Sequence, residues 1–434
     1  MKKIRVRYGK GHISLKIPEQ NLAQVIQPRK TQASRDIAGT IRQALLTPKG
    51  PTLQEIIANR RVCVLIEDGT RSEPHEIIVE ELARQISAAK ELTFIITTGS
   101  HETDSPRNRE IAKAIHDSCQ NHKLEQYKVI IHDGLESPCR LVGTTSRGTP
   151  VKANQEALEK EAYVIAADMK NHYFAGYSNP IKNLLPGICN FASIEANHSL
   201  ALEPESTFGR HPLHPDHSRR SNPVAEDMLE AAQMILSDQP TFVLATITSG
   251  PYILWASSGD LAKVAAEGFT KIDKAASFTV PPTDHIIVSP GGFPQDESLY
   301  NAQRGLELTR NAVNEGGEIL FLAECVKGVA PTPKARTFFF DQLTQPLPEV
   351  ISSIQREYKL YTHKAYKFAQ LIQHVNNIWV HTNLSQTQVK AAHLQYTPKP
   401  QTVIDNWIKH DTEAQILVFN EANKIAVYAE TPSK

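Results

Sequence analysis

One stretch of the chain gathers side chains that can transfer protons, bind a metal and form a covalent bond. It runs from His172 to Gly187 and contains Lys182, and His198 follows soon after it. The stretch is rich in Gly and Pro, which indicates a loop that presents functional groups. An imidazole can move protons near neutral pH or bind a metal, and a lysine amine can form a covalent bond to a carbonyl-type carbon of a cofactor. Few structural roles require these residue types together.

Further candidate residues follow short apolar runs that predict buried strands. Asp68 and Arg71 come after the first run, and His101 comes after the second, in a Gly-Ser loop. A guanidinium fork can bind a phosphate or a carboxylate, and Asp68 can orient a neighbouring imidazole. A salt-bridged turn is the structural alternative for Asp68 and Arg71, and a structural histidine at a strand end is the alternative for His101. The runs that predict strands are Arg61–Glu67, Leu92–Thr97, Val129–His132 and Ala162–Ala167.

The order of the predicted elements indicates an α/β fold. Helical patterns over Glu73–Lys90 and Arg107–Asp117 alternate with these strands. In such folds, ligands gather at the carboxyl ends of the strands. A second α/β unit is predicted to begin at His285–Ser289, with a Gly-Gly loop and a helix from Asp296. The segment Ala414–Ala429 predicts a terminal hairpin.

The predicted second unit holds its own candidate residues. Gly291 and Gly292 form a Gly-rich turn, and backbone amides at the start of the following helix could face an anion. Tyr300, Asn301 and Arg304 would lie on that helix. The arginine can clamp a carboxylate with two parallel hydrogen bonds. The two glycines are therefore candidates for cofactor binding, and the three helical residues are candidates for substrate binding.

The composition is that of a globular protein without a polyanionic partner. The 434-residue chain is long enough for two or three domains, and 40% hydrophobic and 22% charged residues are ordinary values. Lysine plus arginine balances aspartate plus glutamate at 47 each, which argues against nucleic acid as a partner. Five cysteines without a CxxC pair fit free thiols in a reducing compartment. Neither the apolar region of a signal peptide nor an apolar run of roughly 18 residues occurs, so we expect a cytoplasmic protein without a membrane span.

A second group of histidines, His211, His214 and His217, is a rival metal site. Their spacing of three is compatible with metal ligation. Two intervening prolines disfavour a regular helix, however, and neighbouring arginines bring positive charge. We therefore expect a surface loop, or part of the rim of a crevice, at these positions.

Several motifs occur in an order known from one enzyme family. Each is weak alone, but they span nearly the whole chain, and their shared order carries the resemblance. The motifs are Tyr8–Lys10, Asp68–Arg71, Thr98–His101, the stretch His172–His198, Asn222–Ala232, Pro290–Asp296 and the Leu299-Tyr300 pair. On these motifs the chain resembles the nickel-pincer-nucleotide lactate racemases and their 2-hydroxy-acid racemase and epimerase homologues.

The resemblance implies two α/β domains with the active site in the cleft between them. The first domain would span residues 1–278 and anchor the cofactor, and residues 412–434 would return to it. The second would span residues 284–408. The implied partners are a small-molecule 2-hydroxy acid and the cofactor-assembly enzymes, and a homodimer is compatible with the sequence.

The resemblance also implies an isomerase with a lysine-tethered cofactor. Lys182 would form a thioamide with the nickel-pincer nucleotide, which is pyridinium-3-thioamide-5-thiocarboxylic acid mononucleotide, and His198 would supply the protein ligand to nickel. Imidazole is a suitable ligand for this metal. His101 and His172 would alternate as base and acid during hydride transfer to and from the cofactor, because inversion of a stereocentre needs a proton-transfer group on each face. Cofactor contacts are expected at Asp68, Arg71, Gly291 and Gly292, and substrate contacts at Arg71, Tyr300, Asn301 and Arg304.

Departures from the family pattern concern the substrate. Asn179–Ile181 replaces Gly-Gly-Arg before the lysine, and Glu102 replaces an arginine after the first histidine. Asn301 and Arg304 stand where the family usually has glutamine and lysine. The residues for chemistry persist while those facing the substrate change. We therefore expect a 2-hydroxy acid other than lactate, larger or more polar.

Two other classes of function stay open. One is a nicotinamide-type oxidoreductase or lyase, although no clear Gly-x-Gly-x-x-Gly follows a predicted strand. The other is a catalytically inactive organic-acid or nucleotide binding protein. The altered Asn179–Ile181 loop would suit such a protein, whereas the retention of His101 and His172 argues against it.

Overall fold

The computed structural model describes residues 1–29, 33–71, 73–250 and 252–430. It divides the chain into two compact units. One, here called the middle unit, is Thr31–Lys274. The other, here called the terminal unit, combines Met1–Lys30 with Ala275–Lys434. Each unit is built on a six-stranded sheet, so the predicted α/β fold class is confirmed.

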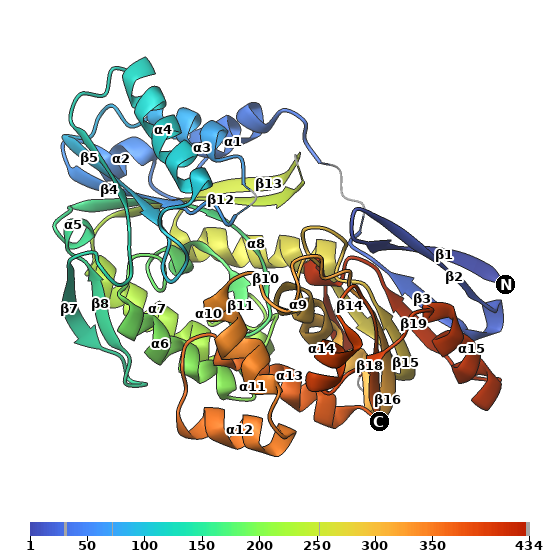
Figure 1. The fold of residues 1–434 in the computed structure, drawn as a ribbon. Coiled ribbons are helices and arrows are strands. Elements are labelled where there is room, and N and C mark those ends of the chain that lie inside the picture. The colour runs from blue at the N-terminus through green and yellow to red at the C-terminus, as the bar shows by residue number, and fades with distance from the viewer. Residues whose placement is uncertain (30–32, 72, 251, 431–434) are drawn as a thin grey trace. The chain divides into compact units, whose positions relative to one another are not determined.

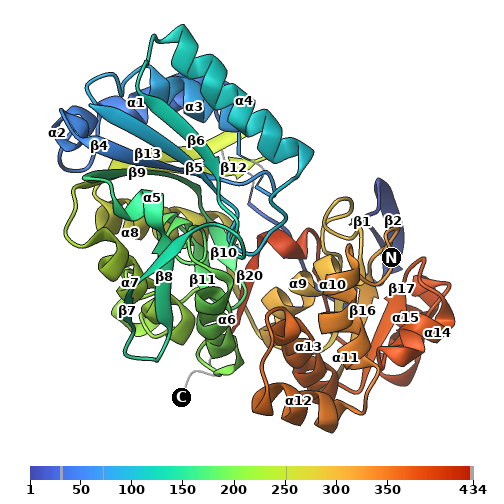
Figure 2. The ribbon, with the colours of Figure 1, turned by 60° about the vertical axis from the view of Figure 1, so that its left-hand side comes forward.

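The sheet of the middle unit has the strand order β13-β12-β9-β4-β5-β6, in which all neighbours are parallel except β12 and β13. Buried side chains of β4 and β5, such as Val64 and Phe94, pack with Ile78 and Ile111 of the covering helices. Figures 1 and 2 show α1, α3 and α4 on one face of this sheet and α6, α7 and α8 on the other. The strands are β4 (Arg61–Glu67), β5 (Glu91–Thr97), β6 (Tyr127–Ile131), β9 (Ala162–Asp168), β12 (Thr241–Ser249) and β13 (Tyr252–Gly259).

The predicted strands of this unit agree with the structure to within two residues at each end, but one predicted helix is shorter. A helix was expected over Glu73–Lys90, and α3 spans only His75–Ala83. The chain turns after Arg84 because Ile86 is fully buried in the core under the sheet. The other helices are α1 (Ile37–Leu46), α2 (Leu53–Ile57), α4 (Pro106–Asn121), α5 (Gln155–Leu158), α6 (Phe191–Ser199), α7 (Pro223–Leu236) and α8 (Leu261–Ala276).

Two small hairpins complete the middle unit. One is formed by β7 (Cys139–Thr144) and β8 (Pro150–Asn154), and the other by β10 (Lys170–His172) and β11 (Gly176–Ser178). The second hairpin leads directly into the turn that carries Lys182.

The sheet of the terminal unit is parallel throughout, with the strand order β18-β17-β16-β15-β19-β3. Trp407 and Ile404 of α15 pack with Val6 and Leu15 of the β1–β2 hairpin and with Leu320 in the sheet. Figure 2 shows α9 and α13 on the opposite side of this sheet from α15. The strands are β1 (Lys2–Tyr8), β2 (Gly11–Ile17), β3 (Leu22–Ile26), β14 (Ser277–Val280), β15 (Thr283–Val288), β16 (Val313–Leu322), β17 (Asn377–His381), β18 (Gln395–Tyr396), β19 (Ile416–Phe419) and β20 (Ala426–Ala429). The helices are α9 (Leu299–Thr309), α10 (Pro333–Ala335), α11 (Asp341–Leu343), α12 (Leu347–Arg356), α13 (Thr362–His374), α14 (Gln386–Ala391) and α15 (Pro400–His410).

The division into units differs from the one expected from the sequence. We expected residues 1–278, with 412–434 returning to them, as the first domain and 284–408 as the second. In the structure, β3 pairs with β19 and β19 pairs with β15, so both ends of the chain complete the sheet of the terminal unit. The expected returning segment also includes residues 431–434, which lie outside the described residues.

The expected terminal hairpin over Ala414–Ala429 is wrong. Its first strand, β19, has β15 and β3 as parallel neighbours, which occupy both of its edges. Its second strand, β20, pairs instead with β14. Among the residues that the structure describes, no helix has both the length and the apolar character needed to cross a membrane.

Candidate functional site

The carboxyl ends of neighbouring strands in the middle unit place an aspartate beside a histidine. Asp68 follows β4, and His101 lies four residues beyond the end of β5, the parallel neighbour of β4. His101 Nδ1 lies 2.8 Å from Asp68 Oδ2. Thr70 Oγ1 donates to Asp68 Oδ1 at 2.7 Å and lies 3.3 Å from His101 Nδ1. The carboxylate thus holds one ring nitrogen of His101 and leaves Nε2 as the atom for proton exchange.

The two partners differ in exposure. The side chain of Asp68 is 2% exposed, and that of His101 is 39% exposed. Burial raises the pKa of Asp68, but the charge and the hydrogen bond of His101 outweigh burial, and the net pKa lies below the usual value. Asp68 therefore stays ionised and can orient the more accessible imidazole.

His172 lies at the end of β10, where the hairpin to β11 turns. Its Nδ1 accepts a hydrogen bond from Ala175 N at 3.2 Å, so Nδ1 carries no proton in this arrangement. Gly176 makes the turn possible, because its φ is +73° and a Cβ there would lie 1.7 Å from the carbonyl oxygen of Arg210. The backbone of this hairpin therefore fixes the ring of His172.

Phe174 contacts two of the candidate histidines. Its ring centroid lies 4.5 Å from that of His172 and 5.3 Å from that of His198, in edge-to-face arrangements. Sequence reasoning missed this residue, because an aromatic side chain in a loop gives no specific signal. The structure thus brings His172 and His198 to one aromatic side chain.

Lys182 lies in a short 3₁₀ turn, Pro180–Asn183, and its residue is only 7% exposed. Asn179 caps this turn, since its Oδ1 accepts from Ile181 N at 2.9 Å. The turn is tied to the sheet because Thr97 Oγ1, at the end of β5, donates to Asn183 Oδ1 at 2.6 Å. These contacts fix the backbone on which the lysine is presented.

His198 lies in the last turn of α6 and is 9% exposed. Burial, and then the positive charge of Lys182, lowers the pKa of His198 to about 3. The imidazole is therefore neutral, which is the form that binds a metal. The charge of His101 lowers the same pKa further, so the three candidates interact electrostatically.

The residue before His198 anchors its helix. Asn197 Nδ2 donates to Asp227 Oδ2 at 2.8 Å, and Asp227 also accepts from the hydroxyls of Thr145 and Thr149 at 2.5 and 2.8 Å. Asp227 is fully buried on α7. The sequence motif Asn222–Ala232 contains Asp227, but no role was predicted for this residue. An aspartate among the apolar residues of a predicted helix face was the signal that could have identified it.

Arg71 lies beside a buried carboxylate. Its Nε is 3.6 Å from Glu67 Oε1, and the other oxygen of Glu67 accepts from Asp168 N at 2.8 Å. Burial, and then the charge of Glu73, raises the pKa of Glu67 to about 8, although Arg71 opposes this shift. Arg71 is thus held at the same strand ends as Asp68, and its role in binding a ligand stays a prediction.

The Gly-Gly turn belongs to the terminal unit. Gly292 has a φ of +71°, and a Cβ there would lie 2.6 Å from the carbonyl oxygen of Gly9, to which Phe293 N donates at 2.7 Å. The turn therefore packs against the turn between β1 and β2. Gly291 precedes it with a φ of +131°. A role for these glycines in cofactor binding stays a prediction.

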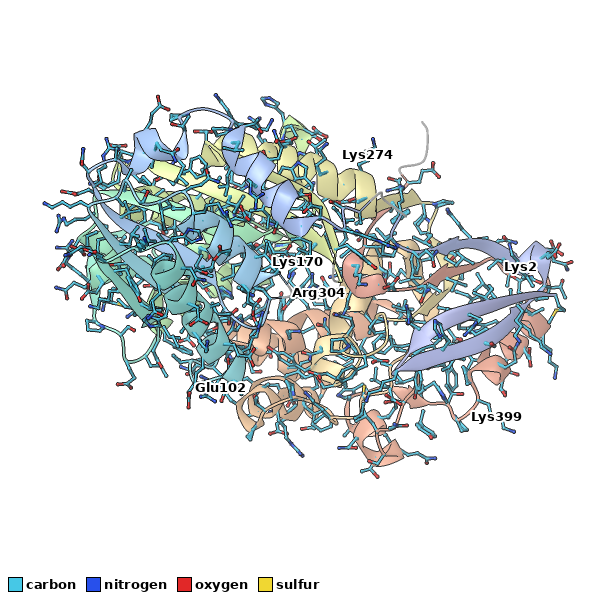
Figure 3. All side chains as sticks on the ribbon, turned by 90° about the horizontal axis from the view of Figure 1, so that it is seen from above. Lys2, Glu102, Lys170, Lys274, Arg304 and Lys399 are labelled. Carbon is cyan, nitrogen blue, oxygen red and sulfur yellow. The ribbon has the colours of Figure 1, made fainter. Side chains whose placement is uncertain are left out.

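The helix after this turn begins later than expected. Asp296 does not open it, because Asp296 Oδ2 accepts from Gly9 N at 2.8 Å, and Ser298 caps α9 instead. Tyr300, Asn301 and Arg304 do lie on α9, as expected. Asn301 Nδ2 donates to Glu297 Oε1 at 3.0 Å. Figure 3 labels Arg304 on this helix and Glu102 in the loop before α4 of the middle unit.

The expectation of a surface loop at the second histidine group is wrong for two of its members. His211 and His214 are buried, and only His217 is exposed. His214 Nε2 lies 3.1 Å from Asp273 Oδ2, and Arg219 Nη1 donates to the same oxygen at 2.5 Å. This carboxylate on α8 draws the loop inward. Within the described ranges, no group of three or more His, Cys, Asp or Glu side chains could hold a metal ion.

The chain is thus an α/β protein with one mixed and one parallel sheet, and its middle unit holds an aspartate–histidine pair at the strand ends and a buried histidine that interacts with His101 and Lys182. Two family descriptions match the chain. The lactate racemase N-terminal domain matches residues 8–209, and the lactate racemase C-terminal domain matches residues 279–427. The chain belongs to the lactate racemase family.

Individual relatives agree with this assignment. The lactate racemase of Thermoanaerobacterium thermosaccharolyticum is 28% identical over 341 residues, which cover 76% of each chain. The lactate racemase of Lactiplantibacillus plantarum is 23% identical over 329 residues, which cover 74% of each chain. Among solved structures, the lactate racemase apoprotein of T. thermosaccharolyticum matches with a TM-score of 0.82 and 21% identity, over 98% of this chain and 100% of that one. A Thermotoga maritima protein matches with a TM-score of 0.64 and 15% identity, over 91% and 98% of the two chains.

Proposed function

We propose that the protein is an isomerase that racemises or epimerises a 2-hydroxy acid. The observation that carries the proposal is the 2.8 Å contact between Asp68 and His101, because it gives one histidine a fixed ring nitrogen and an accessible one. His172 of the same unit is the second proton-transfer group. Inversion at a carbon centre requires such a group on each face of the substrate.

The residues of the middle unit fit the nickel-pincer nucleotide. Lys182 is buried on a capped turn, so a covalent bond between its amine and the cofactor would be shielded from water. His198 is buried and neutral, as a nickel ligand must be. A single protein imidazole is sufficient for a metal whose other ligands come from the cofactor. When bound, this cofactor would supply the acceptor for the hydrogen that leaves the substrate carbon.

The chain's own residues would handle the proton of the substrate hydroxyl. His101 would take it at Nε2 for one stereoisomer, while Asp68 stabilises the imidazolium that forms. In the same turnover, a protonated His172 would donate a proton to the substrate oxygen from the other face, and the two histidines would exchange these roles for the other stereoisomer. Arg71 would orient a carboxylate or a phosphate, because its guanidinium is held by Glu67 at the same strand ends.

The substrate is proposed to be a 2-hydroxy acid other than lactate. Glu102 places a carboxylate where the family pattern has an arginine. On α9, Asn301 and Arg304 replace the glutamine and the lysine that are usual in the family. Loading of the cofactor would require the assembly enzymes as transient partners.

The test is racemisation by protein coexpressed with those assembly enzymes. Single enantiomers of lactate, malate, 2-hydroxybutyrate and phenyllactate are incubated with the enzyme, and the enantiomer ratio is followed by chiral chromatography. We expect at least one acid to approach an equal mixture, and the His101→Asn variant to lose this activity. Cofactor-loaded protein that racemises none of a broad panel of 2-hydroxy acids would instead support a binding protein.

A further inference from the structure

The first residue of the Asn222–Ala232 motif joins three segments of the middle unit. Asn222 is fully buried and caps α7, because its Oδ1 accepts from Ala225 N at 3.0 Å. The amide nitrogen of the same side chain has two further partners. Asn222 Nδ2 donates to the carbonyl oxygen of Phe174 at 2.9 Å and to that of Thr207 at 2.8 Å. The amide oxygen and both amide hydrogens of Asn222 are therefore used inside the protein.

These two donated hydrogen bonds fasten the turn of the β10–β11 hairpin. Phe174 lies in this turn, two residues after His172, whose Nδ1 accepts a hydrogen bond from the backbone of the turn at 3.2 Å. The chain just after Thr207 also contacts the turn, since Gly209 N donates to the carbonyl oxygen of Gly176 at 3.2 Å. The side chain at the start of α7 thus binds both the turn that fixes the His172 ring and the segment that packs against this turn.

The same helix also holds the segment that carries the predicted nickel ligand. Asp227 of α7 accepts from Asn197 Nδ2 at 2.8 Å, and His198 follows Asn197 on α6. The ring of Phe174 contacts the rings of both His172 and His198. α7 therefore makes one buried polar contact to each of the two segments that bear these histidines.

We propose that Asn222 is a positioning residue for proton transfer, which holds His172 in place through the backbone of Phe174. The role in proton transfer rests on the proposed racemase function, whereas the attachment of the hairpin to α7 stands on its own contacts. Aspartate and serine cap helices about as well as asparagine, but neither has two amide hydrogens for two carbonyl oxygens. A residue that served only as the cap of α7 would therefore be replaceable by either of them.

The test separates the cap of α7 from the two donated hydrogen bonds. Asn222→Ser keeps a cap and removes both bonds, and Asn190→Ser is the matched control, because Asn190 caps α6 by accepting from Ser193 N at 3.0 Å. Hydrogen–deuterium exchange of residues 170–178 is followed by mass spectrometry in the full chain without cofactor. We expect exchange at least roughly tenfold faster in Asn222→Ser, because two buried hydrogen bonds are lost, and unaltered exchange in the control. Unaltered exchange of β4 and β5 in both variants shows that the effect is local.

In loaded enzyme, we expect Asn222→Ser to lower kcat at least roughly tenfold and to change KM less than roughly threefold, since substrate still binds while His172 is misplaced. A purely structural role would lower the melting temperature and leave the kcat of the folded enzyme unaltered. Asn222→Asp, which has the size of the native side chain and also caps the helix, should shift kcat in the same direction.

Unaltered exchange of residues 170–178 in folded Asn222→Ser protein would overturn the proposal, and so would faster exchange with an unaltered kcat. If this variant does not fold, Asn222→Asp gives the same comparison. Exchange of the hairpin at the rate of an unstructured peptide in the unaltered protein would overturn the proposal whatever the variants do. Loaded, unaltered protein that racemises no 2-hydroxy acid would refute the proposed function, while the exchange result still decides whether Asn222 fastens the hairpin.

Discussion

Removal of the charge on Asp68 is the perturbation whose effect the geometry defines best. In the unaltered protein, Asp68 Oδ2 lies 2.8 Å from His101 Nδ1. The Asp68→Asn side chain keeps the size of the aspartate and its place after β4, but it has no ionised oxygen to offer to His101. A hydrogen bond to a charged group contributes about 1.5–3 kcal/mol, and about 1.4 kcal/mol corresponds to a factor of ten. The imidazole is 39% exposed, so water screens part of the interaction. We therefore expect kcat to fall roughly tenfold to a hundredfold.

The assay is the initial rate of racemisation of a single enantiomer by loaded enzyme, followed by chiral chromatography. Asp104→Asn is the control, because Asp104 lies in the same loop as His101 but has a side chain that is 85% exposed and pairs with Arg109. Nickel content and the melting temperature are measured for each variant, so that loss of cofactor or of fold is recognised. A folded, loaded Asp68→Asn enzyme with the kcat of the control would refute the proposed role of the pair.

Three other outcomes are expected from the structure. In the folded protein, burial and then Glu73 raise the pKa of Glu67 from 4.5 to about 8, so the folded state holds a proton that the unfolded state has released. The stability that this protonated carboxyl contributes is present below pH 4.5 and is lost as the pH rises to about 8. Glu67→Gln should therefore reduce the pH dependence of the free energy of unfolding in urea over this range. An unchanged pH dependence in the variant would contradict this role of Glu67. Gly176→Ala should lower the free energy of unfolding by more than about 1 kcal/mol in the same assay, because φ is positive at this position and a Cβ would meet the backbone of Arg210. A variant as stable as the wild type would contradict the close approach of these two segments. His198→Gln should lower the nickel content of coexpressed protein while the melting temperature stays close to wild type, and full nickel occupancy would exclude His198 as the ligand.

The strand ends of the middle unit were predictable because their signal is local. Each strand there is a short apolar run that ends at a polar residue or loop, as at Glu67 and Thr97. Neighbouring parallel strands end at the same edge of a sheet, so the proximity of Asp68 and His101 follows from two such runs. From the sequence, Asp68 was expected to be able to orient a neighbouring imidazole, and in the structure His101 lies beside it.

Other features depend on contacts between residues far apart in the chain. The pairing of β3 with β19 joins residues close to the two ends of the chain, and no local pattern distinguishes β19 as an interior strand of that sheet. His214 is buried because Asp273, 59 residues later, lies beside it, whereas the sequence around it is rich in proline, histidine and charged residues. Lys364 lies in a polar stretch that indicates an exposed helix face, and it is buried only because α13 packs against α9. In each case, tertiary packing determines the strand pairing or the burial of the side chain, and the local sequence indicates a different result.

The central claim is that Lys182 anchors a nickel cofactor in the middle unit. The most direct measurement is the intact mass and nickel content of protein coexpressed with the cofactor-assembly enzymes, with Lys182→Ala as the variant and Lys170→Ala as the control on the preceding hairpin. We expect a covalent mass increment that maps to Lys182, near-stoichiometric nickel, and loss of the increment only in Lys182→Ala. Unmodified, nickel-free protein under conditions that load the Lactiplantibacillus plantarum lactate racemase would contradict it.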